Sequence, residues 1–174
     1  MAFATACASF ASAQTTRPSA TQGALPANAG PGASGVEVTI TSAKLEALLL
    51  KKHNPDNTTE DLVSDKSLLV IRLQILNKGK KEITYNSFNG TQGKNDRASL
   101  LDSNKKFAAL ANFGDLEVVG ITKTAKLKPG ESVNDLLAFA PPEEGVKPTV
   151  LYLPAPNHGD RGLWKLDVKL EESP

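Results

Sequence analysis

Residues 127 to 142 have the sequence Leu127-Lys-Pro-Gly-Glu-Ser-Val-Asn-Asp-Leu-Leu-Ala-Phe-Ala-Pro-Pro142. Pro129 presets φ for the first central position of a β-turn, and Gly130 supplies the positive φ that a type II turn needs at its second position. The apolar run that follows, Val133 to Ala140, predicts a strand that stops at the double proline. A tight turn feeding a short strand is typical of an antiparallel β domain.

Alternating patterns on either side of this stretch extend the prediction. Between Ser67 and Asn77, Leu69, Ile71, Leu73 and Ile75 alternate with residues of the opposite face, which predicts a central strand. Further strands are predicted at Val36–Ile40, Leu116–Ile121, Thr149–Leu153 and Leu163–Leu170, with a hairpin over Ala98–Ala109 that turns at Asp102 to Lys105. Short strands separated by turns favour an all-β fold, an antiparallel immunoglobulin-like β-sandwich of about seven to nine strands.

Two segments before the central strand are less regular. Residues 42–52 are rich in Ala, Leu, Glu and Lys, which favour a helix locally, whereas their position between strands favours an extended segment. We predict a strand there and keep the helix as the alternative. His53 to Lys66 is polar, and we expect it to be a loop.

The first 35 residues differ in composition from the rest of the chain. Residues 1–13 are small and apolar and end in Ala11-Ser12-Ala13, which resembles a signal-peptidase site, although no basic residue precedes the run. Residues 14–35 are Ala-, Thr-, Pro-, Gly- and Ser-rich and predict a disordered linker. We therefore expect a signal peptide or its remnant at 1–13, a linker at 14–35, and one β-sandwich domain at 36–174. This order predicts an extracytoplasmic location, periplasmic, secreted or at the cell surface, of a bacterial type.

Charge and cysteine content exclude some classes of function. Val36 to Pro174 contains 19 of the 20 Lys and Arg residues and all 19 Asp and Glu residues, so this region is formally neutral and lacks the basic excess of a nucleic-acid binder. The single cysteine, Cys7, lies in the presumed leader, which leaves the mature domain without thiol chemistry. Cys7 also leaves open a lipid anchor, as against a free mature chain. No stretch of the mature chain is long and apolar enough to predict a transmembrane span.

Five features in the same order resemble a known family. They are Val36 to Ala43, the apolar strand ending at Asn77, the Tyr85-Asn-Ser-Phe-Asn-Gly90 segment, the Leu127 to Pro142 stretch, and Leu151-Tyr-Leu-Pro-Ala followed by Gly162-Leu-Trp. Together these resemble the extracytoplasmic immunoglobulin-like domains grouped as DUF4352, which are similar to secreted telokin-like bacterial proteins. The resemblance implies an exported or lipid-anchored immunoglobulin-like sandwich of unknown molecular function, and it supplies no family site residues.

Two polar clusters are candidates for chemistry. Asp56, Glu60, Asp61 and Asp65 gather in one predicted loop and offer the oxygen ligands that calcium prefers, without the spacing of an EF-hand. His158 and Asp160 are two residues apart between strands and could form an acid/base pair, but no nucleophile motif accompanies them. A solvated acidic loop and an ordinary turn are the simpler interpretations of the two clusters.

We therefore expect an exported, non-catalytic interaction or structural module rather than an enzyme, without a cofactor. Its partner would be a protein or another component of the cell envelope, contacted through loops or a sheet edge. The alternative is an extracytoplasmic protein that binds calcium or another small ligand through the acidic loop at 54–65.

Overall fold

A computed structural model describes residues 35–90, 97–159 and 161–171. The predicted antiparallel, immunoglobulin-like β-sandwich is confirmed. The described residues form twelve strands and one short 3₁₀ helix, more strands than the seven to nine expected because several are only two to five residues long. No helix in these described ranges has the length and apolar character needed to cross a membrane. The predicted leader at 1–13 and almost all of the linker at 14–35 lie outside the described residues.

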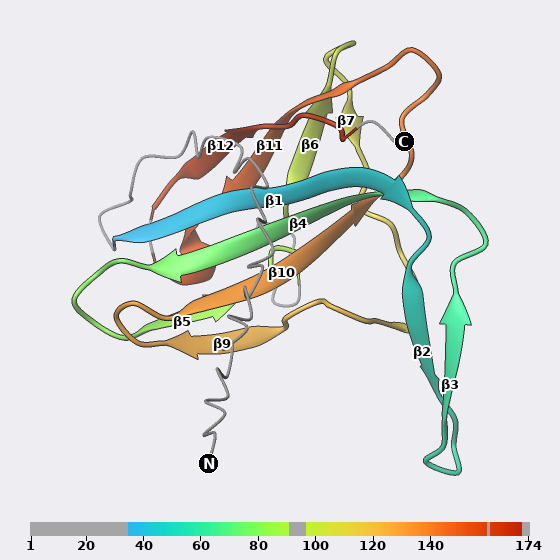
Figure 1. The fold of residues 1–174 in the computed structure, drawn as a ribbon, viewed down its shortest axis with the longest axis horizontal. Coiled ribbons are helices and arrows are strands. Elements are labelled where there is room, and N and C mark those ends of the chain that lie inside the picture. The colour runs from blue at the N-terminus through green and yellow to red at the C-terminus, as the bar shows by residue number, and fades with distance from the viewer. Residues whose placement is uncertain (1–34, 91–96, 160, 172–174) are drawn as a thin grey trace, which may run out of the picture.

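One face of the sandwich is a three-stranded sheet in the order β1-β4-β10. Its strands are β1 (Val36–Glu46), β4 (Leu68–Asn77) and β10 (Ser132–Phe139). The two pairings are antiparallel, and β4 lies between the other two strands, as its sequence pattern predicts (Figure 1). A short two-stranded ladder of β5 (Ile83–Asn86) and β9 (Thr124–Leu127) lies beside β10.

The opposing face is a four-stranded sheet in the order β12-β11-β6-β7. Its strands are β6 (Ser99–Asp102), β7 (Phe107–Ala108), β11 (Pro148–Pro154) and β12 (Leu163–Asp167). The hairpin predicted over Ala98–Ala109 is confirmed, since β6 and β7 pair directly and the Lys105 N–H donates to the Asp102 carbonyl across the turn.

The main core fills the space between these two sheets. Leu69, Ile71, Leu73 and Ile75 of β4 are all at most 1% exposed, and Trp164 of β12 packs in the same cluster. The alternation that identified β4 in the sequence therefore corresponds to one face of a strand turned fully into the core.

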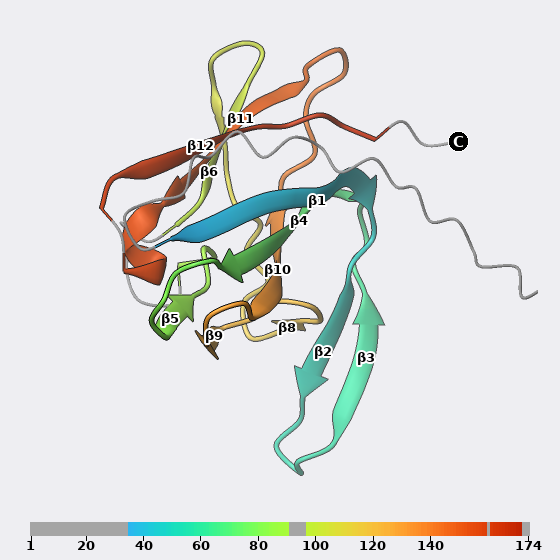
Figure 2. The same ribbon diagram turned by 60° about the vertical axis from the view of Figure 1, so that its left-hand side comes forward.

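A third layer packs against the outer face of β4 and β10 at one end of the two strands. It is a sheet in the order β3-β2-β8, made of β2 (Leu49–His53), β3 (Thr59–Val63) and β8 (Glu117–Val118), and we call it the hairpin sheet. Leu50 and Val118 from this sheet pack with Val70, Leu136 and Ala138 in a second apolar cluster. Figure 2 shows the β2–β3 hairpin standing away from the body of the sandwich, attached at its base.

The hairpin sheet corrects the sequence prediction for residues 42–66. The strand interpretation of 42–52 is right and the helix alternative is wrong, although the chain bends after Glu46 to divide the segment between β1 and β2. The loop predicted over His53 to Lys66 is wrong, because residues 59–63 form β3. Only Leu62 of β3 is even half-buried, so the strand has no alternation of apolar residues to reveal it. It forms through its pairing with β2.

The predicted turn at Pro129 and Gly130 is confirmed. Gly130 has a φ of 84°, and the Glu131 N–H donates to the Lys128 carbonyl at 3.0 Å, as in a type II turn. The Gly130 N–H also donates to the Asn77 carbonyl at 2.7 Å. The turn is thereby fastened to the end of the central strand.

A buried carboxylate in the middle of β10 joins three segments. Asp135 is 2% exposed and accepts four hydrogen bonds, from the Tyr85 hydroxyl (2.5 Å), the Ser87 hydroxyl (2.8 Å), and the N–H groups of Thr122 (2.9 Å) and Leu136 (2.8 Å). Burial raises the pKa of Asp135, and the four donors oppose that effect. Burial and the nearby Asp135 carboxylate also raise the pKa of Tyr85.

The raised pKa of Asp135 predicts how stability depends on pH. Because the folded pKa lies above the unfolded value of about 3.9, the folded state holds this proton at pH values where the unfolded state has lost it. The free energy of unfolding of the wild type, minus that of Asp135→Asn, should therefore rise as pH falls through the folded pKa, and level off below about pH 3.9. Urea denaturation of both proteins at a series of pH values measures this difference. A difference that falls with decreasing pH would contradict the assignment.

The second cluster predicts that the hairpin sheet can be loosened without the sandwich. Leu50→Ala removes a side chain that is 5% exposed, and a truncation of this kind costs about 2–5 kcal/mol. Amide hydrogen exchange should accelerate in β2 and β3 and stay slow in β4. The matched control is Leu49→Ala. Leu49 is the neighbour of Leu50, points to the other face of β2 and is 42% exposed, so its truncation should change amide exchange little. Equal effects of the two variants would show that the second cluster does not anchor the hairpin.

Candidate functional site

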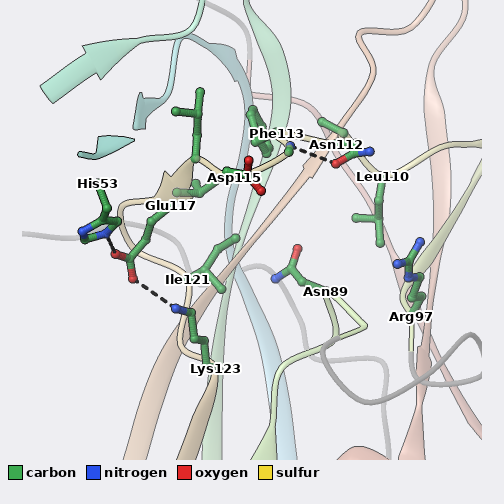
Figure 3. Close-up of a pocket in the computed structure, with 14 residues that line it drawn as sticks. His53, Asn89, Arg97, Leu110, Asn112, Phe113, Asp115, Glu117, Ile121 and Lys123 are labelled. Carbon is green, nitrogen blue, oxygen red and sulfur yellow. Dashed lines mark hydrogen bonds and ion pairs between the residues drawn. The ribbon is translucent and has the colours of Figure 1, made fainter. Parts of the chain in front are cut away.

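A hollow lies where the hairpin sheet meets the main sandwich. It has a volume of about 520 Å³, within the range of small-ligand pockets. Its walls come from the end of β2, from residues 89 and 97, and from the segment 110–123 that leads through β8 (Figure 3). Segments far apart in the sequence therefore meet at this place.

One wall is a row of charged side chains. His53 Nε2 lies 2.9 Å from Glu117 Oε2, and Lys123 Nζ lies 3.4 Å from Glu117 Oε1 (Figure 3). Hydrogen bonds from His53 and then Lys123 hold the pKa of the Glu117 carboxyl below its usual range. Glu117 thus contacts both basic side chains at the rim.

The opposite wall is formed by Asn89 and Arg97, which pair in an isolated β-bridge. The Asn89 side-chain amide donates to Ser87 Oγ and to the Leu136 carbonyl, each at 2.9 Å, so its orientation is fixed. Gly90 has a φ of 79°, and a Cβ built there would meet Arg97 Cγ at 2.2 Å. Only glycine at position 90 lets the arginine side chain lie across the backbone.

The Arg97 guanidinium is available to a ligand. Among the residues that the structure describes, no carboxylate lies within ion-pair distance of it. Between Arg97 and the charged wall lie Leu110 and Ile121, both half-buried (Figure 3). Ile121 packs against the second apolar cluster and Leu110 against the main core.

This arrangement suits binding. A guanidinium is a strong partner for a carboxylate or phosphate, and an apolar floor accepts the hydrocarbon part of a ligand. The described residues that line the hollow include no Ser, Thr, Cys or Tyr. The groups on this lining offer ion pairing and hydrogen bonding around the apolar side chains of Leu110 and Ile121.

The four acidic residues proposed as calcium ligands lie elsewhere. Asp56 is in the β2–β3 turn, where its carboxylate accepts bonds from the Thr58 N–H (3.0 Å) and hydroxyl (2.6 Å). Glu60 and Asp61 are consecutive in β3, so their side chains point to opposite faces, and Asp65 follows the strand. No group of three or more His, Cys, Asp or Glu residues is placed to hold a metal ion within the described ranges.

The other predicted cluster is only partly described. His158 ends the short helix η2 (Ala155–His158) and is 1% exposed, with its ring centroid 4.7 Å from that of Trp164. Asp160 lies outside the described residues. The imidazole is thus packed in the core instead of lining an open loop.

No pattern in the sequence indicates the hollow. Arg97 lies in one segment and Glu117 and Lys123 in another, 110–123, and none stands in a motif with a known spacing. The one available signal was the predicted strand at Leu116–Ile121, which is shorter than expected because only Glu117 and Val118 pair.

Comparisons with known proteins add one structural neighbour. No family model matches the sequence, and no curated protein matches it. A crystal structure of the yjhA protein from Bacillus subtilis is similar over 72% of this chain and 73% of that chain, with 18% sequence identity and a TM-score of 0.41.

The placement of the acidic residues predicts the outcome of a calcium test. Since Glu60 and Asp61 point apart and Asp56 is engaged by Thr58, we expect millimolar calcium to leave the melting temperature unchanged. Asp61→Ala should behave as the wild type does in the same titration. A calcium-dependent rise in melting temperature that Asp61→Ala abolishes would restore the calcium-binding alternative.

Proposed function

We propose that this chain is an exported, non-catalytic interaction module that holds its ligand in the hollow between the hairpin sheet and the sandwich. The observation that carries the proposal is the position of the Arg97 guanidinium, which pairs with no carboxylate of the described residues, beside an apolar floor of Leu110 and Ile121. Such a combination selects a ligand with an anionic group at one end and a hydrocarbon body.

The residues behind the walls of the hollow favour binding of a ligand without rearrangement of the protein. Asn89 is held by Ser87, and Ser87 in turn donates to the buried Asp135 carboxylate. The floor rests on two apolar clusters. A site whose walls are fixed before binding loses less conformational freedom when the ligand arrives.

The proposed location rests on the sequence. The Ala11-Ser12-Ala13 pattern, the charge-poor segment that follows it and the resemblance to DUF4352 domains all favour export. We propose the periplasm or the cell surface as the place of work, and an envelope protein or other envelope component as the source of the ligand.

Affinity capture tests the proposal. The full chain is immobilised and exposed to an envelope extract, in parallel with Arg97→Ala and with Lys126→Ala, a control cation exposed on β9. A saturable partner should bind the wild type and Lys126→Ala, while Arg97→Ala should weaken binding about tenfold or more, because a charge-assisted hydrogen bond is lost. Equal binding to all three proteins would exclude the hollow as the site.

A further inference from the structure

The outer edge of β3 is an open strand edge. In the sheet order β3-β2-β8, β3 has a neighbour on one side only among the described strands. Its partner β2 is enclosed, with β3 on one side and β8 on the other. An unpaired strand edge is a ready template for another extended chain.

The hydrogen-bond pattern shows which backbone groups are left over. The Ser64 N–H donates to the Leu48 carbonyl, and the Asn54 N–H donates to the Thr58 carbonyl. The backbone hydrogen bonds between β2 and β3 therefore join even-numbered residues of the hairpin. Because the bonding direction alternates along an antiparallel pair, Glu60 and Leu62 point their backbone groups inward to β2. Thr59, Asp61 and Val63 therefore direct their N–H and C=O groups to the open side. The same alternation holds on β2, where the Leu49 carbonyl points the other way and accepts from the Val119 N–H.

The side chains of β3 define what could pair there. Val63 is 63% exposed, Leu62 is half-buried, and Asp61 and Glu60 are exposed acids. On its covered side, β3 already faces Leu49, Leu50, Lys51 and Lys52 in that register. Within its own fold, β3 thus pairs with a strand that has two apolar residues followed by two basic residues.

A second β3 strand is a poor occupant of the edge. Only Thr59, Asp61 and Val63 offer backbone groups to the open side, so antiparallel pairing of two β3 strands can centre on Asp61, setting Asp61 against Asp61, or on Glu60, setting Glu60 against Glu60. Like charges directly opposite each other destabilise a strand pair, whereas opposite charges stabilise it. In these two registers the acids oppose self-association, and the same two acids favour a basic strand.

We propose that the open edge of β3 is a docking site for an extended segment of another protein, with two apolar residues followed by two basic residues, added antiparallel to the hairpin sheet. The added strand would bond to the backbone of Thr59, Asp61 and Val63 and place its basic side chains opposite Asp61 and Glu60. This site goes beyond the proposed function, since it uses neither Arg97 nor the floor of the hollow.

A synthetic peptide copying residues 47–54, Ala-Leu-Leu-Leu-Lys-Lys-His-Asn, is the probe. Titrated into the full chain, it should bind saturably, and amide exchange at Thr59, Asp61 and Val63 should slow. Exchange at Glu60 and Leu62, whose N–H groups are already bonded to β2, should not change. Slowing at both sets, or at neither, would overturn strand addition.

Two further comparisons separate strand addition from general attraction of charges. N-methylation of the peptide at the residues equivalent to Leu49 and Lys51 removes the N–H groups that would bond to β3, and should abolish binding. N-methylation at the residues equivalent to Leu50 and Lys52 should be tolerated, because those N–H groups point away from β3. Equal binding by both methylated peptides would contradict the proposal.

On the protein side, the double variant Glu60→Gln, Asp61→Asn should weaken the peptide roughly twofold to thirtyfold, as the loss of two cross-strand charge pairs implies. The control, Glu143→Gln with Glu144→Gln, changes the net charge equally at exposed residues of a distant turn and should bind like the wild type. Arg97→Ala should also bind the peptide normally, so failure of this site and failure of the hollow are distinguishable. If both double variants weaken peptide binding equally, the weakening comes from the change in net charge and contradicts docking at β3.

Discussion

Strand β10 is buried on both faces between Asp135 and Phe139, and the rest of the structure depends on this constraint. Leu137 and Phe139 face the main core, while Leu136 and Ala138 face the second apolar cluster. An ordinary strand of an antiparallel sandwich is wet on one side. Here the outward face is apolar as well, and burying it requires the third layer. The hairpin sheet is thus a consequence of the apolar run in β10 as much as of its own sequence.

Asp135 is the first residue of the stretch of β10 that is buried on both faces, and its hydrogen bonds link the core to the surface. Its carboxylate fixes Tyr85, Ser87 and the backbone of Thr122 around one point. Through Ser87 the network reaches Asn89 on the wall of the hollow. A buried carboxylate with a full set of donors costs desolvation and gains a defined geometry. One hydrogen-bond network therefore connects the buried Asp135 carboxylate to the wall of the hollow.

The sequence predicted the parts of the fold whose side chains alternate or whose turns need special residues. β4 was recognisable because every second residue enters the core, and the turn at Gly130 because its φ is positive. β3 was not recognisable, since its residues are nearly all exposed and its pairing comes from β2.

The candidate site could not be predicted for a different reason. Arg97 and Glu117 are brought to one hollow by the third layer, and the sequence contains no local pattern for a layer that forms through tertiary contacts. The acidic residues at 56–65 formed a cluster along the chain, yet the strand between them turns Glu60 and Asp61 to opposite faces. Proximity in sequence was a poor guide to proximity in space here.

Gly35, the first described residue, fixes the start of β1 against the turn after β4. Gly35 has a φ of 74°, its carbonyl accepts from the Lys78 N–H at 2.8 Å, and a Cβ there would meet Gly79 Cα at 2.7 Å. From this clamp β1 runs 11 residues, about 35 Å, to the end of the sandwich that carries the β2–β3 hairpin (Figure 1). The β2–β3 hairpin therefore lies at the end of β1 opposite Gly35, with the length of the sandwich between them.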